Sequence, residues 1–131
     1  MGQKVSPIAF RIGINKDWNA KWYASNKDFK KFIENDNKIR KFLSTKLKEA
    51  SVSNVVIERN KKNTEVTIYT AKPGVIIGHG GEEIEKLKNN LNKLVNENIQ
   101  ISIVEIKNPN LHGKIVADSI AHQIENRASF R

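Results

Sequence analysis

The sequence predicts an α+β fold in which helices cover one small β-sheet, and three observations lead to that class. Residues 64–70 and 99–106 alternate apolar and polar side chains, which is the two-residue period of strands with one buried face. Residues 84–95 carry apolar side chains at steps of three and four, which is the period of an amphipathic helix. Glycines at positions 78, 80 and 81 precede that helix. Strands joined through helices favour a layered α+β arrangement.

The composition predicts a basic protein with room for one compact domain and an appendage. The chain has 131 residues, and 23 Lys and Arg against 14 Asp and Glu give a formal net charge of +9. This excess favours nucleic acid or an acidic membrane surface as a partner, although charge alone is equally compatible with a well-solvated surface. There are no cysteines, and no apolar run approaches the roughly 20 residues that span a bilayer. We therefore expect a soluble intracellular protein without disulfides or a membrane span.

Residues 1–27 follow neither the strand period nor the helix period. Their basic residues are Lys4, Arg11, Lys16, Lys21 and Lys27, and their aromatic residues are Phe10, Trp18, Trp22 and Tyr23. Such a segment is either an arm that becomes ordered against a partner or an irregular strand or loop packed on its own domain. The sequence leaves both alternatives open.

Helical spacing begins at Phe29 and continues through Ile33. The polar run Asn35–Asn37 predicts a break, after which Asp36 or Asn37 caps a second helix. The apolar side of this second helix carries Ile39, Phe42, Leu43 and Leu47. Its other face carries Lys38, Arg40, Lys41, Lys46 and Lys48, and is either merely solvated or a contact for RNA or protein.

A β-hairpin is predicted next. Residues 55–57 form a short strand, Asn60–Asn63 form a polar turn, and residues 64–70 return with Val66, Ile68 and Thr70 on the buried face. Pro73 then opens a very short helix that ends at Gly78, because proline suits the first helical position.

The second half of the chain continues with a helix, a strand and a last helix. The amphipathic helix places Ile84, Leu87, Leu91, Leu94 and Val95 on one side, and Glu82, Glu83 and Glu85 at its positively polarised start. The third strand covers residues 99–106 and ends before Asn108-Pro109-Asn110. The last helix begins near Lys114, with an apolar stripe of Ala117, Ile120, Ala121, Ile124 and Ala128.

The glycine turn, residues 78–81, fits only one of the functional chemistries that glycine-rich turns support. A nucleotide-hydrolase loop needs Lys and Ser or Thr where Glu82-Glu83 stand here, and these carboxylates repel a triphosphate. A dinucleotide fingerprint fails because Glu83 occupies the place of the third glycine. An esterase oxyanion loop needs a G-x-S-x-G elbow, which the chain lacks. The remaining pattern, G-x-x-G, lets a nucleic-acid backbone approach bare amide groups at a helix N-terminus.

No catalytic or metal site is predicted. His79, His112 and His122 share no metal-ligand spacing, and no cysteine supplements them. The glutamates after the turn are partners of the helix dipole and not catalytic carboxylates. We therefore expect no enzyme activity, no metal, no cofactor and no small-molecule substrate, which disfavours the rival hypothesis of a small hydrolase that uses His79.

The stretch "VIIGHGGEEIEKL", residues 75–87, resembles the signature of KH domains, V-I-I-G-x-x-G followed by an amphipathic helix. Together with the preceding helix and strands and the following strand, it resembles the type II KH order, αββααβ. The resemblance implies a loop that clamps about four nucleotides. The residues implied in RNA binding are Ile76, Ile77, Gly78, His79, Gly80 and Gly81. One isoleucine is expected in the core and the other along the nucleotide groove.

The N-terminus resembles the bacterial small-subunit ribosomal protein S-three family. The motifs M-G-Q-K-V-x-P, R-x-G-I and D-W-x-x-x-W-Y of that family occur here between Met1 and Tyr23, and residues 38–43 and 116–131 are also similar. The resemblance implies a structural constituent of the small ribosomal subunit in the cytoplasm. It implies binding to 16S rRNA in the subunit head, near where mRNA enters. Its further implied partners are mRNA and the neighbouring head proteins.

The resemblance also implies a division of the chain. We expect an rRNA-binding arm at 1–27, a type II KH domain at 28–107 and a C-terminal helix at 108–131 that leads to a second domain. The arm residues expected to bind RNA are Lys4, Arg11, Lys16, Trp18, Lys21 and Trp22. The cations meet phosphates, whereas the aromatic side chains either stack on bases or pack on the protein, with packing the commoner fate of tryptophan.

Two features depart from the family, and one alternative function stays open. His79-Gly80 stand where the family usually has basic residues, which keeps backbone donors but removes side-chain contacts to phosphate. The chain stops at Arg131, where the family continues, so we expect an N-terminal portion. The alternative is a free-standing KH RNA-binding factor in RNA processing or ribosome assembly. The N-terminal motifs favour the ribosomal protein.

Overall fold

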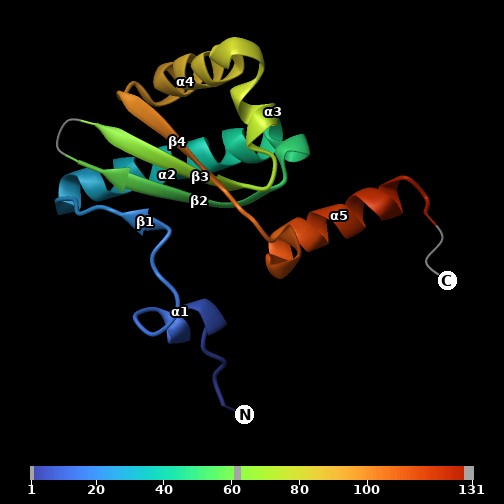
Figure 1. The fold of residues 1–131 in the computed structure, drawn as a ribbon. Coiled ribbons are helices and arrows are strands. Elements are labelled where there is room, and N and C mark those ends of the chain that lie inside the picture. Colours follow the sequence, from blue (N-terminus) through green and yellow to red (C-terminus); the bar gives the residue numbers. More distant parts are fainter. Residues whose placement is uncertain (1, 61–62, 129–131) are drawn as a thin grey trace.

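A four-stranded sheet in the order β1-β2-β3-β4 forms one layer of the fold (Figure 1). In this computed structural model, which describes residues 2–60 and 63–128, the strands are β1 (Ala20–Lys21), β2 (Val52–Arg59), β3 (Thr64–Thr70) and β4 (Ile99–Glu105). β2 and β3 form the predicted antiparallel hairpin, while β1 runs parallel to β2 and β4 runs parallel to β3. Because parallel neighbours need a long crossover connection, the chain between β3 and β4 carries two helices.

From the second helix onward, the elements confirm the predicted αββααβ order with a C-terminal helix. The helices are α1 (Pro7–Arg11), α2 (Asn26–Lys46), α3 (Pro73–Ile77), α4 (Glu82–Val95) and α5 (Gly113–Glu125), with short 3₁₀ turns at Lys48–Ala50, His79–Gly81 and Pro109–Leu111. From α2 to β4 the chain reads helix, strand, strand, helix, helix, strand, so the αββααβ order and the C-terminal helix are both present. In Figure 1 the α1 and α5 segments extend away from this central unit.

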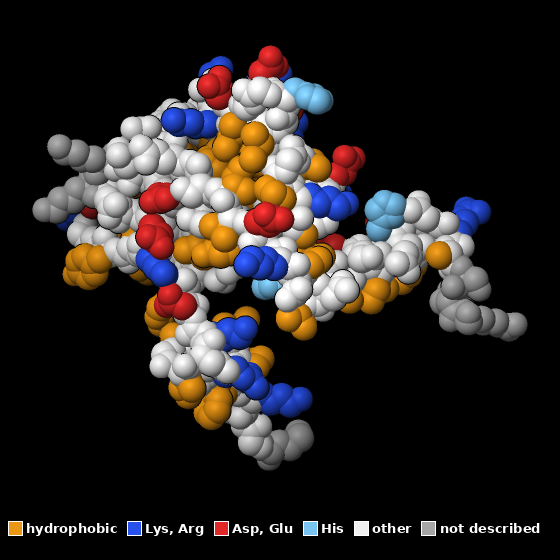
Figure 2. Space-filling view, viewed as in Figure 1, with side chains coloured by type: hydrophobic (Ala, Val, Ile, Leu, Met, Phe, Trp, Pro, Cys, Tyr) orange, Lys and Arg blue, Asp and Glu red, His pale blue; other side chains and the backbone are white. Residues whose placement is uncertain are grey.

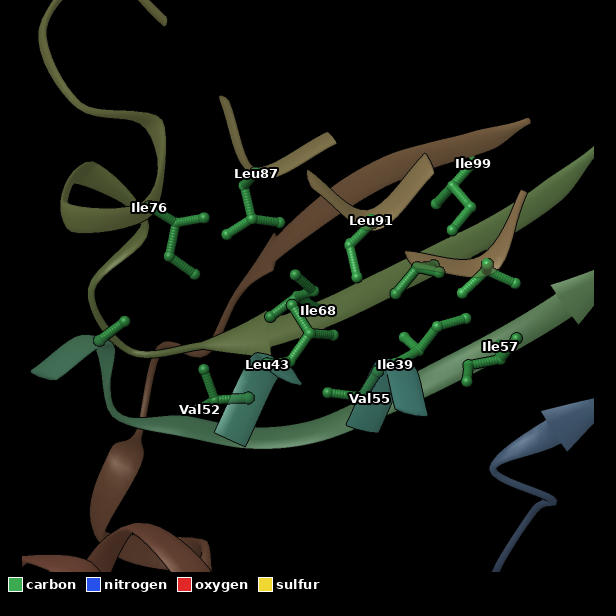
Figure 3. Packing of buried hydrophobic residues seen from close by; sticks show 13 residues of the cluster. Ile39, Leu43, Val52, Val55, Ile57, Ile68, Ile76, Leu87, Leu91 and Ile99 are labelled. Carbon is green, nitrogen blue, oxygen red and sulfur yellow. The ribbon is translucent and has the colours of Figure 1, made fainter. Parts of the chain in front are cut away.

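The core lies between one face of the sheet and helices α2, α3 and α4 (Figure 3). Val55 pairs with Ile68 and Ile57 with Val66, so these side chains share one face of the hairpin. The helices contribute Ile39, Leu43, Ile76, Leu87, Leu91 and Val95 to the same cluster. The predicted alternation along β3 is confirmed, because Val66, Ile68 and Thr70 are all buried.

The predicted break in the first helix is wrong, since α2 runs without interruption from Asn26 to Lys46. Asn35 and Asp36 are buried and bond to distant side chains instead of capping a new helix. The Asn35 amide Nδ2 donates to Glu97 Oε1 at 2.8 Å, and the Trp22 indole Nε1 donates to Asp36 Oδ2 at 2.9 Å. Polar residues that favour caps in isolation therefore serve here as tertiary contacts.

Arg59, at the end of β2, is the centre of a buried polar network that the sequence did not indicate. Its side chain is only 5% exposed, and its guanidinium pairs with the carboxylates of both Asp36 and Glu97. The Thr64 hydroxyl donates to Glu97 Oε2 at 2.9 Å, and the guanidinium carbon lies 4.9 Å from the centre of the Phe32 ring. The network joins β2 to α2 and to the loop after α4.

Several predicted boundaries and faces differ from the structure. The arm contains α1 and β1, where no regular element was expected, and β2 is longer than the predicted 55–57. Leu94 was assigned to the apolar side of its helix but is exposed. Of the predicted turn Asn60–Asn63, residues 61–62 lie outside the described residues, although the Asn60 amide donates to the Asn63 carbonyl at 2.9 Å.

The predicted apolar stripe of the last helix does not reach the core. Ile120 and Ile124 are 51% and 64% exposed, and Ala128 lies beyond the end of α5. The buried residue of α5 is Ile115, which the sequence analysis did not single out. Helical spacing shows which side chains share a face, but not whether anything covers that face.

Candidate nucleic-acid interface

The glycine turn connects α3 to α4 and adopts a backbone conformation that suits glycine. Gly78, Gly80 and Gly81 have φ values of +69°, +63° and +85°, in the region that residues with a Cβ rarely adopt. A Cβ built on Gly78 would also lie 2.4 Å from Glu83 Cγ, whereas nothing lies within 4 Å of a Cβ built on Gly80 or Gly81. Glycine is therefore required at position 78 for space as well as for conformation.

The turn presents backbone donors at the start of a long helix. The Gly78 amide is already bonded at the end of α3, where it donates to the Gly74 carbonyl at 2.9 Å. His79 and Gly80 are exposed, and no hydrogen bond found among the described residues has either of their amides as its donor. Gly81 occupies the N-cap position of α4 and has no side chain with which to bond the backbone amides of the first turn. These donors and the helix dipole together suit a bound anion such as a phosphate.

An apolar strip lies beside the donors. One of the two isoleucines was expected in the core and the other along the nucleotide groove. Ile76 is 1% exposed and belongs to the core, whereas Ile77 is 41% exposed and therefore accessible. Ile101 and Ile103 of β4 are half-buried at the edge of the same core. Figure 2 shows hydrophobic surface between the turn and β4. A single-stranded nucleic acid whose phosphate binds these amides can place its bases along this apolar surface.

The charges around the turn are mixed (Figure 2). Glu82, Glu83 and Glu85 all stand in the first turn of α4, where the sequence analysis placed them as partners of the helix dipole. Lys86 Nζ lies 3.3 Å from Glu82 Oε2, so part of the nearby positive charge is already paired. Any affinity of this turn for phosphate therefore depends on backbone donors more than on side-chain cations.

Four of the six predicted RNA-binding residues of the arm are exposed and take no part in the ion pairs of the described residues. Lys4 and Lys16 are exposed and form no ion pair among the described residues. Arg11 is exposed, and its Nη1 donates to the Pro7 carbonyl at 2.9 Å, which leaves its other guanidinium donors available. Trp18 is 61% exposed.

Lys21 and Trp22 are engaged within the protein. The Lys21 ammonium lies 2.9 Å from Asp17 and 3.6 Å from Glu58. Its hydrogen bond to Asp17 lowers the pKa of that carboxyl and raises the pKa of Lys21 itself. The Trp22 ring centre lies 5.6 Å from that of Phe29 and 5.5 Å from that of Phe32, which confirms the packing alternative for Trp22.

Trp22→Phe is expected to lower the free energy of unfolding by about 1–2 kcal/mol. The substitution keeps a ring against Phe29 and Phe32 but removes the indole N–H of Trp22, so that Asp36 Oδ2 loses its 2.9 Å partner. Urea denaturation measures the change. Trp18→Phe is the matched control, because Trp18 is mostly exposed, and its effect should stay within about 0.5 kcal/mol. Equal effects of the two variants would contradict the anchoring role of Trp22.

The basic face of α2 is only partly a solvated face. Arg40 donates from Nη1 to the Val55 carbonyl and from Nη2 to the Asn19 carbonyl, both at 2.7 Å, and so joins α2 to β2 and to the arm. Burial lowers the pKa of Arg40. Lys38 pairs with Glu34 at 2.7 Å, whereas Lys41, Lys46 and Lys48 are exposed. The sequence gave no sign that Arg40 differs from these lysines.

Neither a metal-binding cluster nor a membrane-spanning helix is present among the described residues. Across residues 2–60 and 63–128, no three His, Asp or Glu side chains come together in a group that could hold a metal ion. None of the described helices combines the length and the apolar character needed to cross a membrane.

Comparison with known proteins gives two kinds of match. A protein-family model described as "KH domain" matches residues 38–111. Curated relatives include the small ribosomal subunit protein uS3 of Staphylococcus aureus strain COL and of strain MW2. Each is 54% identical over 131 residues, which is 100% of this chain and 60% of the relative. The chain therefore spans 60% of the length of these relatives.

Proposed function

The chain belongs to the KH domain family, and from that premise we propose that it is a structural constituent of the small ribosomal subunit. Its proposed ligand is 16S rRNA in the subunit head, near where mRNA enters. Its proposed further partners are the neighbouring head proteins and mRNA, and its proposed location is the cytoplasmic ribosome. The role is one of binding and involves no catalysed reaction. The observation that carries the proposal is the 54% identity to uS3 across the entire chain, including the arm.

The proposed mechanism has two parts. In the first, the glycine turn lets a phosphate approach the free amides of His79 and Gly80 at the start of α4, beside the apolar strip with Ile77. In the second, exposed cations of the arm neutralise phosphates, with Lys4, Arg11 and Lys16 as the residues assigned. Trp18 is accessible for stacking on a base, whereas Lys21 and Trp22 act through the position they give to the arm.

The proposed division of labour follows the three segments expected from the sequence. Residues 1–27 act as the rRNA-binding arm, and residues 28–107 act as the KH domain. The family match at 38–111 supports the second assignment. Residues 108–131 form the C-terminal segment with α5, which contacts β2. The Ser53 hydroxyl and His112 Nδ1, 2.9 Å apart, join this segment to the sheet.

A co-sedimentation experiment tests the function. The tagged chain is assembled into small-subunit particles in vitro with 16S rRNA and the remaining small-subunit proteins, and the particles are washed at high salt and pelleted. We expect the chain to remain with the particles in about equimolar amount, because a subunit constituent is held by many contacts at once. A free-standing KH factor, held mainly by phosphate contacts, should be released by the wash. Release would therefore favour the alternative function and contradict this proposal.

A further inference from the structure

A second concave surface lies away from the glycine turn and shares no residue with it. This groove, about 660 Å³ in volume, runs between the C-terminal half of α2, the start of β2 and one face of α5. Asp118, Ala121 and His122 of α5 line this groove and are not part of the core. The glycine turn contributes no residue to this surface, whereas the arm reaches its edge, where Asn19 bonds to the lining residues Arg40 and Asn54.

The charge of the groove is unevenly distributed. Its basic lining residues are Arg40, Lys41, Lys48 and Lys114, and its acidic lining residues are Asp118 and Glu125, so four positive charges face two negative charges for a net of +2. Lys41, Lys48 and Lys114 are exposed and form no ion pair within the described part of the chain. Arg40 and Lys41 belong to α2, Lys48 to the 3₁₀ turn that follows it and Lys114 to the start of α5, whereas both acidic lining residues belong to α5.

The α2 wall is fixed in place by hydrogen bonds and carries a hydroxyl between its cations. The two 2.7 Å hydrogen bonds of Arg40 to backbone carbonyls fix α2 against β2 and the arm. Ser44 lies between Lys41 and Lys48, and its hydroxyl donates to the Lys41 carbonyl at 2.8 Å while its oxygen can still accept. Ser53 and Asn54 add further polar groups from β2. Hydroxyl and amide side chains next to cations are typical contacts of phosphate and sugar.

We infer that this groove binds the sugar-phosphate backbone of RNA, as a contact separate from the glycine turn. The inference rests on the proposed RNA-binding function and adds a site to it. A protein partner fits less well, because protein interfaces are centred on accessible apolar side chains. The apolar residues at the groove floor, Leu43, Val52 and Val55, are already buried in the domain core. None of the large apolar side chains that line the groove is exposed, and apart from Ala121 its exposed lining residues are charged or polar.

The test compares two double variants with the same loss of charge. Lys41→Ala/Lys48→Ala removes two groove cations, and Lys30→Ala/Lys31→Ala removes two exposed cations from the other end of α2. Binding of the full chain to a 16S rRNA transcript is measured by fluorescence anisotropy over a salt series. We expect the groove variant to bind about fivefold or more weakly at low salt, with a salt slope shallower by about 2. The control variant should stay within about twofold of the unsubstituted chain.

The outcomes separate this inference from the proposed function. If the unsubstituted chain binds the transcript and both variants bind equally well, the groove inference is overturned and the proposed function stands. If the unsubstituted chain does not bind the transcript, both fail. A photo-crosslinking residue in place of Ser44 gives an independent readout in a mixture of 16S rRNA and small-subunit proteins. A crosslink to RNA supports the groove contact, and crosslinks only to protein overturn it. Urea denaturation confirms that the variants are folded.

Discussion

Arg59→Ala is expected to lower the free energy of unfolding by about 3–5 kcal/mol, a large part of the total stability of a small domain. The guanidinium is the shared partner of Asp36 and Glu97 in a site where its own side chain is 5% exposed. Removing it leaves two carboxylates facing each other without a counter-charge, and the loss of the cation above the Phe32 ring adds to the cost. Urea denaturation followed by circular dichroism measures the change.

Lys38→Ala is the matched control for Arg59→Ala. Lys38 also pairs with a carboxylate, that of Glu34 at 2.7 Å, but both side chains are about half exposed to solvent. Exposed pairs of this kind contribute little, so its effect should stay below about 1 kcal/mol. If Arg59→Ala proves too unstable to purify, Arg59→Lys keeps the charge while losing the forked geometry and should fall between the two. An Arg59→Ala effect as small as that of Lys38→Ala would show that the network does not stabilise the fold.

The second large effect concerns the glycine turn. His79→Asp/Gly80→Asp is expected to weaken binding of a short single-stranded RNA by about tenfold or more, because two carboxylates beside the free amides repel the phosphate that those amides would accept. The free energy of unfolding should change little. Both residues are exposed, nothing lies within 4 Å of a Cβ built on Gly80, and aspartate tolerates a positive φ better than most residues. Fluorescence anisotropy and urea denaturation measure the two quantities.

The choice of Gly80 over Gly78 follows from the structure. Gly78 and Gly81 are the two glycines of the G-x-x-G pattern, so either would be an obvious position for a disruptive aspartate. At Gly78, however, the new Cβ would collide with Glu83, so a loss of binding there would not separate repulsion from a distorted turn. Asn89→Asp/Asn90→Asp is the control, since it adds the same two negative charges at exposed positions in the middle of α4. If both double variants bind RNA equally well, the turn is only a connection between two helices.

Local patterns predicted most of the elements. Alternation along β3 and β4, the proline at the start of α3 and the glycines at its end each follow from the geometry of a few neighbouring residues, and the structure confirms them. The same local reasoning failed at Asn35–Asn37, where cap-forming side chains lie inside a continuous helix. Their bonding partners, Trp22 and Glu97, are far away in the sequence and invisible to a local pattern.

The candidate site was also only partly predictable. The turn between α3 and α4 could be found because glycine spacing and helix polarity are local properties. The roles of the basic residues could not, because Arg40, Lys21 and Lys41 look alike in the sequence. Folding directs Arg40 to two carbonyls, pairs Lys21 with two carboxylates and leaves Lys41 open in a groove.

By itself, the sequence determined the αββααβ order of the central unit, the position of the glycine turn and the basic character of the surface. Each of these depends on side chains within a few residues of one another. Only the tertiary structure decided which charges are paired in the interior, which aromatic residue anchors the arm and where α5 leaves a basic groove. The physical reason is that burial and pairing are properties of segments brought together from distant parts of the chain, and their energies arise only once water has been removed between them.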